Sequence, residues 1–162
     1  MLKILFVCHG NICRSPMAEF VCRHFLTEAG IAGVEIASAA LHTDEIGNDI
    51  HSGTRRELKA HGIPFAPRAA WLLSPASAAE YDVIFGMDDY NMADLRRLVG
   101  RAKTPVCIKL LNLVGSTANV ADPWYTGNFD ETYEDIVTAC REMIRRLQKN
   151  VSVASLTAPF TK

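Results

Sequence analysis

Short apolar runs alternate with helical patterns along this chain of 162 residues, and that alternation constrains the fold more than any other feature. We expect strands at Leu2–Val7, Val34–Ala39, Tyr81–Met87 and Val106–Ile108. We expect helices near Pro16–Ala29, Ser52–His61, Asp88–Leu98 and Asp130–Gln148. Strands that alternate with helices predict the α/β class, here an open, mostly four-stranded parallel sheet with helices on both faces. Such sheets bind ligands at the carboxyl ends of their strands.

The loop after the first strand carries the strongest chemical signal and reads Cys8-His9-Gly10-Asn11-Ile12-Cys13-Arg14-Ser15-Pro16. Ser15 is expected to be the N-cap of the next helix, with Pro16 at its first position. Gly10 and Asn11 tolerate left-handed backbone angles, so successive N–H groups can converge on an anion in front of the helix N-terminus. The loop therefore predicts a phosphate-binding site.

This loop places a thiol beside a guanidinium. Arg14 offers a planar fork that can hold two phosphoryl oxygens at once, and the positive surroundings favour the nucleophilic thiolate of Cys8. Ser15 is placed to donate a hydrogen bond to the sulfur when it leaves. Cys140 and Arg146 have the same spacing, but they lie in a glycine-free helical segment whose N–H groups bond within the helix. That second pair predicts no anion site.

Length, charge and cysteine usage narrow the class of protein. We expect one domain over residues 1–162, with a loosely held tail at 152–162 that lacks helical periodicity. The net charge of −1 and the scattered basic residues argue against a nucleic-acid partner. The apolar N-terminal run is interrupted by Lys3 and is too short for a signal peptide or a membrane span. An odd number of cysteines, 5, without such a signal indicates thiols in a reducing compartment, so we expect a cytoplasmic protein.

In their order and spacing, these motifs resemble the low-molecular-weight protein tyrosine phosphatases. The family signature C-x4-C-R-S is present from Cys8 to Ser15, and the resemblance extends over nearly the whole chain through Ser38-Ala39-Ala40, Tyr81-Asp82-Val83-Ile84, Met87-Asp88-Asp89-Tyr90-Asn91 and Asp122-Pro123-Trp124-Tyr125. The resemblance implies a protein-tyrosine-phosphatase, a hydrolase that needs no metal or other cofactor. Its expected partners are tyrosine-phosphorylated proteins or small aryl phosphates.

The resemblance also implies the catalytic residues Cys8, Arg14 and Asp122. Cys8 attacks the phosphorus in line, Asp122 protonates the departing tyrosine oxygen, and Asp122 then activates the water that hydrolyses the phosphocysteine. General acid help of this kind typically accelerates a reaction by about 10²–10⁴-fold. Taken alone, the dipeptide Asp122-Pro123 also fits an ordinary turn.

Phosphate and substrate are expected to contact the loop and two aromatic residues, namely His9, Gly10, Asn11, Ile12, Cys13, Ser15, Trp124 and Tyr125. Ile12 suits a flat aromatic ring, and because similar enzymes that act on phosphoarginine carry threonine there, it favours phosphotyrosine. Trp124 and Tyr125 form one wall of the pocket or simply anchor their loop. The family resemblance also implies a reversible disulfide between Cys13 and Cys8 that protects the nucleophile, the alternative being that Cys13 only packs.

The chain departs from the family pattern at several positions. Asp44 stands where relatives usually have an aromatic residue facing the cleft, which should disfavour acidic phosphopeptides. Pro67 stands where many relatives have a histidine that holds the loop asparagine, so Asn11 is expected to be held by Ser15 and Ser38 instead. Trp124 replaces a common tyrosine.

Three other functions compete with this interpretation. A thiol-dependent arsenate reductase would need two further relay cysteines, but the segment from Trp71 to Gly100 contains none and Cys107 falls on an expected buried strand. A phosphoarginine phosphatase of the same fold is the nearer alternative. A non-catalytic phosphopeptide-binding module is expected to have lost Cys8 or Asp122, and both are present.

Overall fold

The computed structural model describes residues 1–161. Its elements are β1 (Leu2–Cys8), α1 (Arg14–Glu28), β2 (Val34–Ala40), α2 (Ser52–Ala60), α3 (Pro75–Ala78), β3 (Val83–Gly86), α4 (Asp89–Val99), β4 (Val106–Lys109), the 3-10 helix η1 (Leu110–Val114), α5 (Pro123–Thr126), α6 (Phe129–Lys149) and α7 (Val153–Thr157). No helix within these residues combines the length and apolar character required to cross a bilayer.

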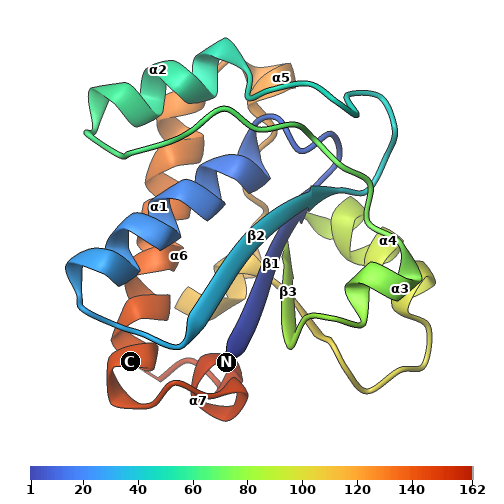
Figure 1. The fold of residues 1–162 in the computed structure, drawn as a ribbon, viewed down its shortest axis with the longest axis vertical. Coiled ribbons are helices and arrows are strands. Elements are labelled where there is room, and N and C mark those ends of the chain that lie inside the picture. The colour runs from blue at the N-terminus through green and yellow to red at the C-terminus, as the bar shows by residue number, and fades with distance from the viewer. Residues whose placement is uncertain (162) are drawn as a thin grey trace.

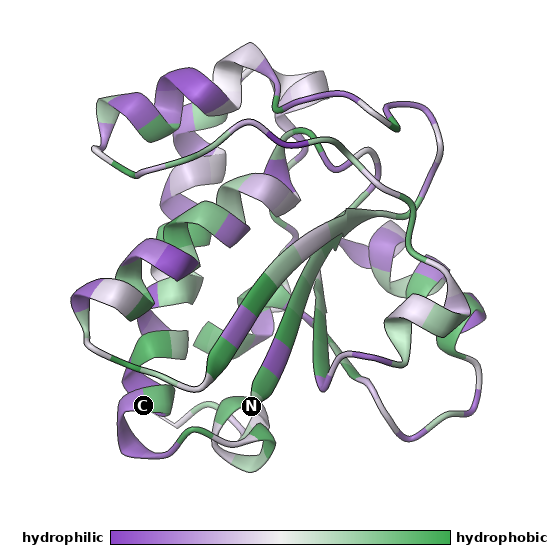
Figure 2. Cartoon of the chain, in the orientation of Figure 1, coloured by the Kyte–Doolittle hydropathy of each residue, from purple (hydrophilic) through white to green (hydrophobic). Residues whose placement is uncertain are grey.

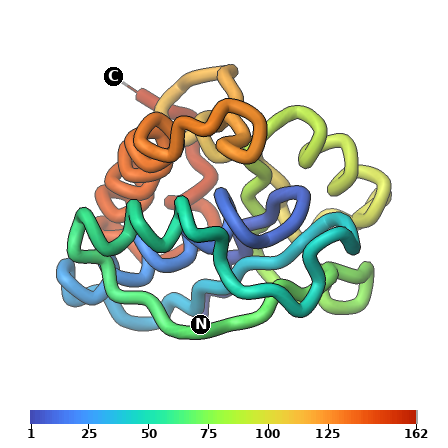
Figure 3. The backbone as a smooth tube through the Cα atoms, turned by 90° about the horizontal axis from the view of Figure 1, so that it is seen from above, coloured from blue at the N-terminus to red at the C-terminus, as the bar shows by residue number. Residues whose placement is uncertain are grey.

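All four strands are parallel, in the order β2-β1-β3-β4, which confirms the predicted class. β1 pairs with β2 from Leu2 opposite Val34 to Cys8 opposite Ala40, so both strands end together. Figure 1 shows α1 and α6 on one side of the sheet and α3 and α4 on the other. The view from above in Figure 3 shows the same layers, with α2 and α1 lying along α6. The order of strands leaves β1 inside the sheet, with its carboxyl end open to a ligand.

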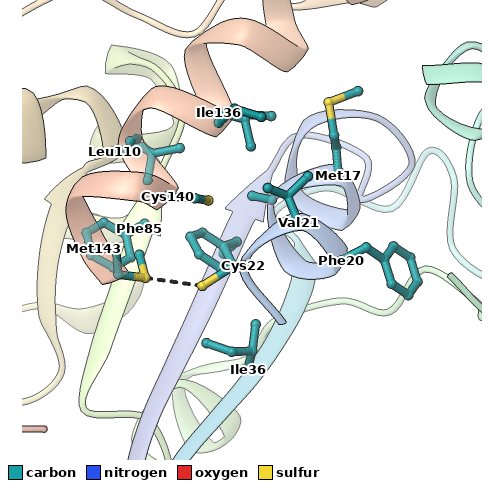
Figure 4. Packing of buried hydrophobic residues seen from close by; sticks show 14 of the residues in the cluster. Met17, Phe20, Val21, Cys22, Ile36, Phe85, Leu110, Ile136, Cys140 and Met143 are labelled. Atoms are coloured by element: carbon teal, nitrogen blue, oxygen red, sulfur yellow. Dashed lines mark hydrogen bonds between the residues drawn. The ribbon is translucent and has the colours of Figure 1, made fainter. Parts of the chain in front are cut away.

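The core consists of two apolar layers, because successive side chains of a strand point to opposite faces. Ile4 and Phe6 join the layer under α1 and α6, whereas Leu5 and Val7 join the layer under α4. The apolar strands are visible in Figure 2. In the larger layer, the Cys22 thiol approaches the Met143 sulfur at 3.3 Å, where α1 meets α6 (Figure 4). Burial of each large apolar side chain of β1 stabilises the folded state by about 1.5–3 kcal/mol. The strand is therefore a firmly held base for the loop that follows it.

The start of α1 differs from the prediction. The helix begins at Arg14, its N-cap is Cys13 rather than Ser15, and Pro16 lies within the first turn. A proline is tolerated there because the first-turn N–H groups have no acceptor within the helix. The Ser15 hydroxyl lies beside Cys8 and Asn11, so it serves the loop instead of capping the helix.

The expectation of a loosely held tail is wrong for the last helix. Leu156 of α7 is fully buried, and the Arg146 guanidinium of α6 donates to the carbonyls of Leu156 at 2.8 Å and Ala158 at 2.6 Å. α7 has too few residues to display helical periodicity, and its position depends on contacts with α6. Residue 162 of that tail lies outside the described residues.

Candidate active site

Cys8 is the last residue of β1 and Arg14 is the first residue of α1, so the loop between them lies at the carboxyl end of a central strand. The Cys8 side chain is almost fully buried. Its sulfur lies 3.1 Å from the Ser15 hydroxyl and accepts a hydrogen bond from the Ser15 N–H at 3.4 Å. In general, hydrogen-bond donors that point at a sulfur favour its anionic form.

Asn11 makes the left-handed corner of the loop, with φ of 59°. Its buried amide donates to the hydroxyls of Ser15 at 2.8 Å and Ser38 at 2.9 Å, as expected. Ser38 in turn donates to Glu19 at 2.6 Å. These bonds connect the corner of the loop to both α1 and β2.

Gly10 does not adopt the left-handed angle that we expected for it. Space at this position is limited, since a Cβ there would lie 3.1 Å from the Cγ of Glu45. Asn11 thus provides the change of chain direction, and Gly10 allows the loop beyond β2 to approach closely.

Arg14 is buried and held on one side by protein acceptors. Its Nη1 donates to Asp88 at 2.6 Å and to the Val120 carbonyl at 2.9 Å, while Nη2 donates to Asp122 at 3.3 Å. Burial alone would lower the pKa of Arg14. The negative charges of Cys8, Asp122 and Asp88 outweigh that effect and raise its pKa above the ordinary value, so Arg14 remains a cation.

Asp88 was not among the predicted site residues. It is the N-cap of α4, where one carboxylate oxygen accepts the Asn91 N–H at 2.8 Å and the other accepts from Arg14. Its position in the sequence could have indicated a place at the site, because Asp88 is an acidic residue just after the buried strand β3, and β3 ends beside β1 at the same edge of the sheet.

Asp122 makes a turn, and its carboxyl group also reaches Arg14. As the N-cap of α5, it accepts the Trp124 N–H at 3.1 Å on Oδ1, with Pro123 in the first turn. Its Oδ2 faces Arg14. The turn therefore holds the carboxyl group in the cleft with one oxygen directed at the guanidinium.

The site opens into a cleft of about 830 Å³, within the range of small-molecule pockets. Six of the eight predicted binding residues line it, namely His9, Gly10, Ile12, Cys13, Trp124 and Tyr125. Asn11 and Ser15 do not line the cleft; both are fully buried, and the hydrogen bond between their side chains supports the loop from inside. Trp124 packs its edge against His51, with ring centroids 5.8 Å apart, and Tyr125 is exposed.

A pair of stacked imidazoles lines the other part of the mouth. The rings of His9 and His42 lie 4.2 Å apart with an interplanar angle of 16°. His9 bonds to Asp44, and His42 bonds to Asp94 of α4 at 2.8 Å. Asp44 thus holds an imidazole where the family resemblance led us to look for a second aromatic wall. His42 and Asp94 were not among the residues predicted for the site.

The remaining cysteines have different surroundings. Burial, followed by the charges of Cys8 and Asp122, raises the pKa of Cys13 to about 12, so Cys13 is a neutral thiol at physiological pH. Cys22 and Cys140 are buried between α1 and α6. Cys107 is only half-buried, because β4 is the edge strand of the sheet.

Arg68 is a second residue that the sequence analysis missed. Its guanidinium donates to the carbonyl of Asn11 and, at 3.1 Å, to the carbonyl of Asn48. It therefore joins the Cys8–Arg14 loop to the segment beyond β2.

Together, the parallel sheet and the Cys8–Arg14 loop at the end of β1 define an α/β protein that places a buried thiol and a guanidinium at the carboxyl end of a central strand. The family model described as "Low molecular weight phosphotyrosine protein phosphatase" matches residues 3–153. The chain belongs to this family of hydrolases.

Individual relatives agree with this assignment. The chain is 39% identical over 152 residues to the low molecular weight protein-tyrosine-phosphatase YfkJ of Bacillus subtilis, covering 92% of this chain and 97% of that protein. The crystal structure of YfkJ superposes with a TM-score of 0.88 at 38% identity, covering 94% of this chain and 98% of that one. The crystal structure of DARP, a drosophila arginine phosphatase, superposes with a TM-score of 0.83 at 26% identity, covering 94% and 99%.

Proposed function

We propose that this chain hydrolyses phosphotyrosine through a phosphocysteine on Cys8, with Arg14 as the phosphate-binding residue and Asp122 as the general acid and base. The observation that carries the proposal is the meeting of these three side chains in one cleft. Arg14 lies beside Cys8 on the same loop, and its Nη2 is 3.3 Å from an Asp122 oxygen contributed by a segment far along the chain.

In the first step, the Cys8 sulfur attacks the phosphorus and forms an S–P bond while the P–O bond to tyrosine breaks. Asp122 transfers its proton to the departing phenolic oxygen, which leaves as neutral tyrosine. Both N–H groups of Arg14 Nη1 already have protein acceptors, Asp88 and the Val120 carbonyl. The other edge of the guanidinium is therefore the fork for two phosphoryl oxygens.

In the second step, water attacks the phosphorus of the phosphocysteine. Asp122 accepts a proton from that water, an O–P bond forms, and the S–P bond breaks to give inorganic phosphate and the Cys8 thiolate. The two donors from Ser15 stabilise the thiolate as it leaves. Arg14 and the loop N–H groups supply the positive charge that phosphoryl transfer requires, so the reaction needs no metal ion.

The preference for phosphotyrosine follows from the apolar and aromatic side chains on the side of the cleft next to the Cys8–Arg14 loop. Ile12 lines it with an apolar surface and Trp124 adds an aromatic one, which together suit the ring of phosphotyrosine. The likeness to DARP keeps phosphoarginine as the second candidate, and Ile12 is the residue that argues against it.

Two further properties belong to this proposal. We place the enzyme in the cytoplasm, because its five cysteines are free thiols and a reducing compartment keeps them so. We take residues 1–162 as one phosphatase domain acting on tyrosine-phosphorylated proteins or small aryl phosphates, without nucleic-acid or membrane partners.

The test compares phosphate release from a phosphotyrosine peptide, a phosphoserine peptide and phosphoarginine, with EDTA and reductant present. Wild type should turn over phosphotyrosine, Cys8→Ser should be inactive, and Asp122→Ala should lose about 10²–10⁴-fold. An arsenate arm with a thiol donor is run in parallel. Arsenate reduction without phosphate release, or a preference for phosphoarginine, would overturn the proposal.

A further inference from the structure

We propose that the mouth of the cleft selects phosphotyrosines that have basic neighbours in their polypeptide and rejects those with acidic neighbours. This inference rests on the proposed phosphotyrosine phosphatase function and specifies its substrate class. It comes from the charges around the opening, which lie outside the residues that handle the phosphate.

Carboxylates dominate the mouth. Asp44, Glu45 and Asp94 line it, and among the described residues of the lining two are cations, Arg14 and Arg97. Arg14 is buried and paired with Asp88 and Asp122, which leaves Arg97 as the exposed cation beside these carboxylates. Arg97 bonds to Asp94, so these two charges largely offset each other. Asp44 and Glu45 remain as an excess of negative charge beside the place where the residues next to phosphotyrosine must pass.

The stacked histidines hold two of the carboxylates at the mouth, Asp44 and Asp94, in position. His9 bonds to Asp44 and His42 bonds to Asp94, from the two rings of one stack. A carboxylate that bonds to an imidazole nitrogen is held in one place at the mouth. The stacked rings, 4.2 Å apart, fix the two imidazoles relative to each other and so fix where Asp44 and Asp94 lie.

The size and composition of the opening suit a polypeptide. Tyr90, Trp124 and Tyr125 line the cleft and are 85%, 57% and 84% exposed. Large exposed aromatic side chains are typical of protein contact surfaces, where they bury area at a small entropic penalty. Segments on either side of a phosphotyrosine would pack on these rings within reach of Asp44 and Glu45.

The effect should be moderate and sensitive to salt. Asp44 is 64% exposed at its side chain, and exposed charges interact weakly and are screened beyond about 10 Å at 0.1 M salt. We therefore expect kcat/KM for a peptide with flanking lysines to exceed that for the matched peptide with flanking glutamates by about threefold to tenfold at low salt. Since flanking residues bind alike in the ground state and the transition state, the difference should lie in KM rather than in kcat.

The experiment measures kcat and KM for two phosphotyrosine peptides that differ only in having lysine or glutamate on both sides, at low salt and again at about 0.5 M salt, where screening is strong. The enzymes are wild type, Asp44→Asn, Glu45→Gln, the double variant and Glu80→Gln. Glu80 is an exposed carboxylate that does not line the cleft, so its variant is the matched control.

Wild type should prefer the lysine peptide through KM, high salt should reduce the preference, and the double variant should bring the ratio close to one. Glu80→Gln should behave as wild type. A ratio near one in wild type, a preference for the glutamate peptide, or an unchanged ratio in the double variant would overturn the inference. Hydrolysis of neither peptide would instead reject the proposed function itself, so the two failures are distinguishable.

Discussion

Asn11 offers the sharpest test of how the phosphate loop is built. Its φ of 59° is strained for most residues, and replacement by alanine in the left-handed region is disfavoured by about 1 kcal/mol relative to glycine. Its amide also donates to Ser15 and Ser38, and each such bond contributes about 1 kcal/mol.

The two effects can be separated by substitution. Asn11→Gly loses the two hydrogen bonds but keeps the backbone angle, so we expect a loss of about 2 kcal/mol, or about 30-fold, in kcat/KM. Asn11→Ala loses both contributions, so we expect about 3 kcal/mol, or more than 100-fold. The predicted order is wild type, then glycine, then alanine.

The assay is kcat/KM for a phosphotyrosine peptide, together with inhibition by inorganic phosphate as a probe of the loop. Activity is the better measure because glycine also increases the entropy of the unfolded chain, which would mask the difference in an unfolding experiment. Urea unfolding serves only to establish that both variants fold. If the alanine variant were as active as the glycine variant, the argument from backbone strain would be refuted.

The remaining predictions concern residues around the site and in the scaffold. Arg68→Gln should weaken inhibition by inorganic phosphate about tenfold. Arg68→Lys should weaken it less, because Lys keeps the positive charge and most of the length with which Arg68 reaches the Asn11 carbonyl; equal inhibition in all three enzymes would contradict this. Iodoacetamide at neutral pH should not alkylate Cys13, because its pKa is raised to about 12 and the thiol stays neutral. Peptide mass mapping measures the modification, and a rate as fast as that of an exposed thiol would argue against the burial of Cys13. Burial, with a further contribution from Asp130, raises the pKa of Glu57 above its ordinary 4.5. The folded state therefore binds an extra proton, and it loses stability as the pH rises from 4.5 through the raised pKa. In urea titrations Glu57→Gln should lose less stability than wild type over this pH range, and an equal loss would be contrary evidence. Leu156→Ala should lower the free energy of unfolding by about 2–4 kcal/mol in urea titrations, whereas a change below about 0.5 kcal/mol would mean that α7 is not part of the core.

The fold was predictable for those helices and strands that are long enough to show a hydrophobic periodicity in the sequence. The strands and the longer helices appear in the structure within a few residues of their expected bounds. α3, α5 and α7 contain only four or five residues each and were missed, because so few residues cannot establish a period. Their caps, such as Ser74 before α3, were the available signal.

The site was predictable where its parts are contiguous. Cys8, Asn11 and Arg14 lie on one loop, so their spacing already carries the geometry. Asp88 and Arg68 reach that loop from other segments, and nothing local to Arg68 indicates that it donates to the Asn11 carbonyl. Contacts of this kind depend on how the sheet brings distant segments together, which a single sequence does not specify.

The central claim is that Cys8 carries the phosphoryl group during turnover. The most direct measurement is a rapid denaturing quench of Asp122→Ala mixed with a nitrophenyl phosphate, followed by intact and peptide mass analysis. That leaving group departs without a proton, so the first step proceeds, while loss of Asp122 slows hydrolysis of the intermediate. Our account predicts one phosphoryl group on the peptide that contains Cys8, and none in the Cys8→Ser, Asp122→Ala double variant. A phosphoryl group on another residue, or release of nitrophenol at a steady rate from an enzyme that never becomes phosphorylated, would contradict it.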